Sequence, residues 1–120
     1  MKKLIKLSLD DAWGLYDLLD EDIYSMRTEV IDVSALPYIN MAKELLVWIS
    51  KEIKKNSDSV EFSIDSSDEF EYIEDLCQSY LTYKKTSDEN KQTCCIILNQ
   101  LRPEKETYKE HHKKYAQWED

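Results

Sequence analysis

Two short pairs of side chains in the sequence could bind a metal ion or transfer a proton, namely Cys94-Cys95 and His111-His112. Zinc sites usually separate two cysteines by two to four residues, whereas adjacent helical residues point about 100° apart. No nucleophile motif, E-x-x-H or H-E-x-x-H accompanies the histidines. We therefore expect no catalytic residue, no metal site and no cofactor, and we expect the cysteines to pack as small apolar side chains.

Carboxylates form the other candidate group, and they are unevenly distributed. The chain has a formal net charge of -9; residues 8–33 hold eight acidic side chains beside one cation, and residues 57–76 hold eight acidic side chains and no cation. Several of these residues open predicted helices, where the partial positive charge of the helix N-terminus favours a carboxylate. The others need a different explanation.

Two further pairs of carboxylates, Asp17 with Glu21 and Glu71 with Asp75, are spaced four residues apart. Like charges at this spacing destabilise a helix by roughly 0.2–0.5 kcal/mol a pair. Aromatic and apolar side chains bordering such charge are typical of a protein interface. The predicted partner-binding residues are Trp13, Asp17, Leu18, Glu21, Glu71, Tyr72 and Asp75. The alternative is that both acidic faces are only solvated.

The elements that would position these residues are mostly helices. With one glycine in 120 residues, the chain has few sites for tight hairpins or phosphate-binding loops. Apolar residues recur every three or four positions over about 9–27, from a cap at Ser34 past Ile53, over about 67–85 and over about 88–102. A fifth helix is predicted at 104–118, and short strands at 3–7 and 60–64, which could pair.

The predicted fold is therefore a mostly α, single compact domain of four to five helices with one or two short strands. An α+β fold with a small sheet is the alternative. The helix that follows Ser34 has apolar residues on more than half of its circumference, so it is predicted to be the most buried. Residues 93–98 are β-branched enough that a strand is an alternative there. One domain covers 1–120, with helix 104–118 in a peripheral place.

Composition also narrows the function. Binding to nucleic acid or to an anionic membrane needs a lysine and arginine surface, which a chain of this charge does not favour. No segment has the length and apolarity of a membrane span. An odd number of cysteines is a poor disulfide framework, so we expect a cytoplasmic protein with reduced thiols.

The leading hypothesis is a small acidic module that binds a basic protein partner. It would act as an inhibitor or immunity-type protein, in phage or bacterial defence, that masks a basic site on a nuclease, with electrostatic steering of association. The alternative is a subunit or homo-oligomer that assembles through Tyr108, Tyr115 and Trp118. An enzyme would require a cleft that converges on His111 or His112 with a carboxylate.

Overall fold

The chain folds into four helices and a two-stranded sheet within the residues that the structure, a computed structural model, describes: 3–28, 36–55 and 58–102. The order is β1 (Lys3–Ser8), α1 (Leu9–Thr28), α2 (Leu36–Lys54), β2 (Ser59–Ile64), α3 (Ser67–Thr82) and α4 (Asp88–Leu101). The predicted mostly α class with a small sheet is confirmed. The predicted helix 104–118 and its aromatic residues lie outside the described residues.

The two strands pair as an antiparallel sheet, with a register that runs from Lys3 opposite Ile64 to Ser8 opposite Ser59. Side chains alternate between the two faces, so Ile5, Phe62 and their same-face neighbours are buried while Lys6 and Glu61 face solvent. The side-chain Nζ of Lys6 lies 3.4 Å from a carboxylate oxygen of Glu61. Both predicted strands and their pairing are confirmed.

Serine caps fix the starts of three helices. The hydroxyl of Ser8 accepts the backbone N–H of Asp11 (3.2 Å), and Ser66 and Ser87 cap α3 and α4 through the backbone N–H three residues on. Helix α4 is continuous from Asp88 to Leu101, so the strand alternative for 93–98 is wrong. Its buried positions recur at helical spacing, and tertiary packing outweighs the β-branched composition there.

Helix α3 ends earlier than predicted, at Thr82 rather than near residue 85. The backbone N–H groups of Tyr83 and Lys84 both bond to the carbonyl of Ser79, at 3.0 and 2.9 Å, which closes the last turn. Predicted and observed ends of α1 and α4 differ by one residue.

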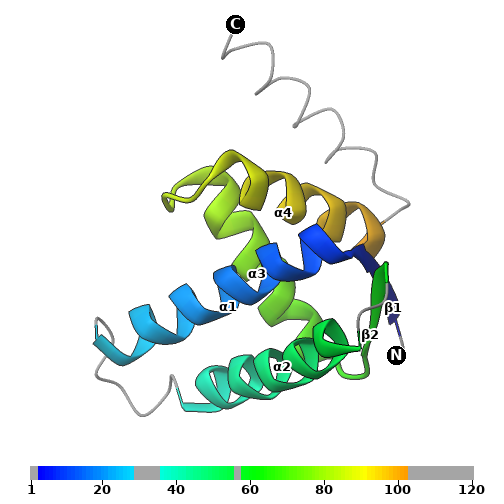
Figure 1. The fold of residues 1–120 in the computed structure, drawn as a ribbon. Helices are drawn as coiled ribbons and strands as arrows, with labels where there is room; N and C mark the ends of the chain where they lie inside the picture. The colour runs from blue at the N-terminus through cyan, green and yellow to red at the C-terminus, as the bar shows by residue number, and fades with distance from the viewer. Residues whose placement is uncertain (1–2, 29–35, 56–57, 103–120) are drawn as a thin grey trace, which may run out of the picture.

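One buried cluster joins both strands and all four helices. Figure 1 shows α1 crossing in front of α3, with α2 and α4 on either side of α1. The prediction that α2 is the most buried helix is wrong, because it buries five residues while α3 and α4 bury seven each. Its side chains Leu36, Tyr38, Val47 and Trp48 are exposed.

None of the helices that the structure describes combines the length and the apolarity needed to cross a lipid bilayer.

Candidate functional site

The only glycine of the chain, Gly14, lies where α1 packs against α4. A Cβ atom at this position would be 2.6 Å from Oγ1 of Thr93 and 3.2 Å from Oδ1 of Asn90. The first distance is shorter than any normal contact, so a larger side chain would push the helices apart. Glycine therefore permits the close approach of the two helices, which sequence reasoning missed although an isolated glycine in a helical pattern is a signal of it.

A hydrogen-bonded floor lies beside this contact. The Thr93 hydroxyl, buried, is 2.9 Å from Oδ1 of Asp11 and donates to that carboxylate, and it is also 3.2 Å from the carbonyl of Glu89. The second oxygen of Asp11 accepts the hydroxyl of Ser8 at 2.9 Å. Asp11 thus connects the end of β1, the start of α1 and the first turns of α4, and it holds these elements in one arrangement.

A groove of 530 Å³ opens above this floor, between α1 and α4. Four of the residues that line it carry carboxylates, and they are Asp10, Asp11, Asp17 and Glu89. The indole of Trp13 forms part of one wall; this side chain is 49% exposed and packs edge-on against Tyr16, with ring centroids 5.6 Å apart. Among the described residues, no lysine, arginine or histidine lines the groove.

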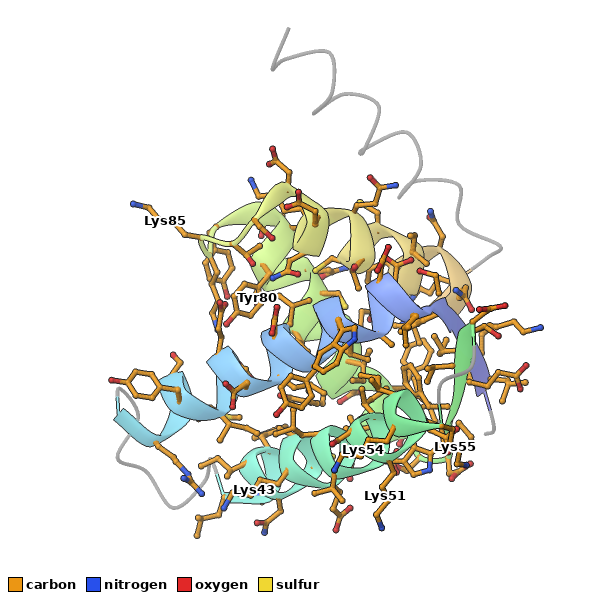
Figure 2. All side chains as sticks on the ribbon, viewed as in Figure 1. Lys43, Lys51, Lys54, Lys55, Tyr80 and Lys85 are labelled. Carbon is orange, nitrogen blue, oxygen red and sulfur yellow. The ribbon has the colours of Figure 1, made fainter. Side chains whose placement is uncertain are left out.

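Helix ends explain only part of this charge. Asp10 and Asp11 occupy the first turn of α1, and Glu89 occupies that of α4, where a carboxylate interacts favourably with the helix dipole. Asp17 lies two turns into α1 and gains nothing from the helix terminus. Lys43 and Lys51 project from the outer side of α2, as Figure 2 shows, and are not among the residues that line the groove. The groove therefore has a local excess of negative charge.

The structure separates the residues predicted on α1. Trp13 and Asp17 line the groove, and Glu21 is exposed one turn further along the same helix. Leu18, predicted to stand on the surface among acidic residues, is completely buried in the core. The buried face of α1 is wider than a single line at spacings of three and four, because α2 and α4 pack on both sides of it.

The residues predicted on α3 are separated in the same way. Glu71 and Asp75 are exposed, but Tyr72 is buried and cannot serve as a surface anchor. Its hydroxyl donates to Oδ2 of Asp22 at 2.6 Å, and Lys84 lies 3.2 Å from the other oxygen of Asp22. Burial, reinforced by the charge of Asp22, raises the pKa of Tyr72 well above its usual value.

Asp22 and Glu74 have no cation near them in sequence, but each pairs with one in the folded chain. Lys84 pairs with Asp22, and Arg102 pairs with Glu74, placing its guanidinium carbon 4.8 Å from the centre of the Phe70 ring. Neither pair follows from helical spacing, since the partners lie 62 and 28 residues apart.

Of the two predicted acidic pairs, Asp17 with Glu21 on α1 and Glu71 with Asp75 on α3, only Asp17 lines the groove. Helix α1 crosses in front of α3, and both helices bury one face in the same core (Figure 1). Asp17 thus borders a groove that also contains the exposed side chain of Trp13, whereas Glu71 and Asp75 are not among its described lining residues. We therefore take the groove between α1 and α4 as the candidate site.

The three cysteines are buried, with Cys94 on the core line and Cys95 beside it, as predicted. A hydrogen bond with Cys94, together with burial, raises the pKa of Cys77, and burial raises the pKa of Cys95 to about 11. Cys77 and Cys95 therefore have little nucleophilic thiolate at neutral pH, and all three buried cysteines contribute to packing. His111 and His112 lie outside the described residues.

The part of the chain that the structure describes has no cluster of three or more potential metal ligands. Comparison of the chain with protein-family models, with curated proteins and with solved structures finds no match.

Proposed function

We propose that this protein is a small acidic binding module that receives a basic segment of a partner protein in the groove between α1 and α4. The observation that carries the proposal is the set of four carboxylates around a half-exposed tryptophan, without a cation among the described lining residues. Carboxylates attract lysine and arginine at long range, and a tryptophan face binds a cation that reaches it. One groove thus offers both features that a basic side chain needs.

A long basic side chain suits this site for a physical reason. Its aliphatic stem can pack along Trp13 and Ile96, while its charged end reaches Asp17 or Asp10 on the adjacent turns of α1. The rigid floor supports this geometry, because Asp11 and Thr93 are already bonded to each other and need no rearrangement. A preformed site of this kind loses little conformational entropy when it binds.

The partner that we propose is a protein with an exposed basic surface, such as the nucleic-acid-binding site of a nuclease. Covering that surface would block access of nucleic acid, so the module would act as an inhibitor or immunity-type protein in the cytoplasm. The net charge of -9 supports this role, since it favours fast association with a basic protein and disfavours direct binding to nucleic acid.

Affinity capture from the native host with two matched variants tests the proposal. Asp17→Lys reverses a charge in the groove, and Glu71→Lys reverses an exposed, mid-helix charge on α3. We expect a basic protein to be retained by the wild type and by Glu71→Lys but lost by Asp17→Lys, and we expect Trp13→Ala to weaken retention. Equal retention by both charge reversals would show that the groove is not the binding site.

A further inference from the structure

The outer edge of β1 is closed by a side chain of α4. The backbone N–H of Lys6 donates to Oε1 of Gln100 at 2.8 Å, and Nε2 of Gln100 donates to the carbonyl of Lys6 at 2.7 Å. Gln100 thus bonds to the strand as a neighbouring strand would. These two bonds show that the N–H and C=O of Lys6 point away from β2. Successive residues of an antiparallel strand point these groups to opposite sides, so the orientation of the neighbouring residues follows.

The edge of β2 has the opposite character. Because the backbone groups of Lys6 point away from β2, Lys6 and Glu61 form a pair without ladder hydrogen bonds, and the backbone groups of Glu61 point away from β1. The same alternation turns the backbone of Ser59 and Ser63 outward. Within 3–28, 36–55 and 58–102, no backbone or side-chain group bonds to these outward N–H and C=O groups. An unpaired strand edge is a template for another strand.

A cleft of 280 Å³ lies beside this edge, between β2, α2 and the start of α3. Phe62 and Ser63 both line it, although their side chains stand on opposite faces of the sheet. The cleft therefore lies against β2 itself, and β1 occupies the opposite edge of this strand. The open side of β2 therefore faces a groove whose far wall is helix α2.

The walls of this cleft define the chemistry of an occupant. Trp48 is half-exposed, packs edge-on against Phe62 with ring centroids 6.0 Å apart, and presents part of its remaining surface to the groove. Three carboxylates and no cation accompany it among the described lining residues, and they are Glu44, Asp65 and Glu69. Glu61 adds a fourth carboxylate on the solvent face of the strand.

We propose that an extended, basic segment of a partner protein binds here by adding a strand to β2, in the groove between β2 and α2. Its backbone would pair with Glu61 and Ser63, and one basic side chain would lie opposite Glu61. The next side chain would enter the cleft, with its stem on Trp48 and its charge near Glu44 or Glu69. This site is separate from the groove between α1 and α4 and extends the proposed function to a second surface.

A second copy of this chain fits the edge poorly. If two β2 edges paired antiparallel about their centre, Glu61 would lie opposite the same residue of the other copy, and like charges directly opposite each other are destabilising. The carboxylates of the cleft would face an equally acidic molecule. A strand with basic side chains on both faces meets neither repulsion, which is why we assign the edge to a basic partner segment.

Proline at Ser63 provides a selective test. It removes an outward N–H that the ladder with β1 does not use, and proline is tolerated on such an edge. Ser63→Ala is the matched control, because it removes the same hydroxyl, which bonds to Asp65 at 2.6 Å, but keeps the N–H. The probe is a short synthetic peptide with two adjacent lysines flanked by valines, so that one lysine lies on each face of the added strand, compared with the same peptide carrying glutamates in place of the lysines.

We expect the lysine peptide, but not the glutamate peptide, to shift the amide resonances of Glu61 and Ser63 and to slow their hydrogen exchange. Ser63→Pro should weaken binding at this edge about tenfold, since it leaves a partner carbonyl without its donor, while Ser63→Ala stays within about twofold. Asp17→Lys should leave these shifts intact, which separates this proposal from the groove between α1 and α4.

The proposal is wrong if the lysine peptide leaves the β2 amides unchanged, if Ser63→Pro binds it as the wild type does, or if those amides are protected by self-association that rises with protein concentration. If Ser63→Pro disrupts the pairing of Ile5 with Phe62, Glu61→Lys replaces it as the test variant. It should then abolish the shift that the lysine peptide causes, and an undiminished shift would overturn the proposal.

Discussion

Replacing Gly14 by alanine tests the contact that forms the floor of the acidic groove. In an exposed helix this change would stabilise the protein by about 1 kcal/mol, because alanine has the higher helix propensity. At Gly14 the new Cβ would be 2.6 Å from Oγ1 of Thr93, and overpacking of this kind costs about 1–3 kcal/mol. The net expectation for Gly14→Ala is a loss of about 0–2 kcal/mol in the free energy of unfolding.

A double-mutant cycle with Thr93 tests whether the effect of Gly14→Ala on the free energy of unfolding comes from this contact. Thr93→Ala removes the closest atom and leaves contacts at 3.2 Å, so in that background Gly14→Ala should be neutral or stabilising by up to about 1 kcal/mol. We therefore expect a coupling of about 1–2 kcal/mol between the two sites, measured by urea denaturation of the wild type, both single variants and the double variant. Additive effects would show that the helices are not held at this distance by Gly14 and Thr93.

Three further outcomes are expected from chemical denaturation. Tyr72→Phe should lower the free energy of unfolding by about 1–3 kcal/mol, because it removes a buried hydrogen bond to the charged Asp22. Gln100→Leu should lower it by about 1 kcal/mol, because both backbone groups of Lys6 lose their partner at a solvent-accessible edge. Burial raises the pKa of Cys95 from 9.0 to about 11, so the thiol of the unfolded chain loses its proton at lower pH than the thiol of the folded chain. The contribution of Cys95 to the free energy of unfolding is therefore complete below pH 9 and declines as the pH rises to about 11.

Matched variants separate these effects from general loss of packing. Tyr83→Phe removes an exposed hydroxyl that lies 3.0 Å from the Ser79 hydroxyl, and it should change stability by less than about 0.5 kcal/mol. Gln100→Glu retains an acceptor for the Lys6 N–H and should fall between Gln100→Leu and the wild type. Above pH 9 the free energy of unfolding of Cys95→Ala should decline less than that of the wild type. A Tyr72→Phe variant as stable as Tyr83→Phe would refute the buried network.

The sequence predicted most of the secondary structure because its signals are local. Serine caps at Ser8 and Ser66 and alternation at 60–64 determine nearby backbone conformation through short-range contacts. The sequence places the end of α3 too late because neither Tyr83 nor Lys84 is a glycine or proline that would signal the end of a helix. Helix α2 was overestimated as a buried element because an apolar face of a helix does not reveal whether enough neighbours exist to cover it.

The candidate site was only partly predictable. Helical spacing correctly identified Trp13 and Asp17 as exposed neighbours, but it could not show that α4 lies beside them and forms a groove. Leu18 and Tyr72 were assigned to the surface because each sits among acidic residues in sequence, whereas their burial depends on helices far away in the chain. Long-range partners such as Asp22 and Lys84 leave no periodic signal, so their pairing required the fold.

The ionic-strength dependence of association tests the central claim most directly. We propose to measure the association rate of the captured basic partner with the wild type, Asp17→Lys and Glu71→Lys at low and at high salt. If the groove steers binding, the wild-type rate should fall steeply as salt screens the charges, and Asp17→Lys should be slow at low salt while Glu71→Lys remains close to the wild type. A wild-type rate that is indifferent to salt, or equal rates for the two charge reversals, would contradict the claim.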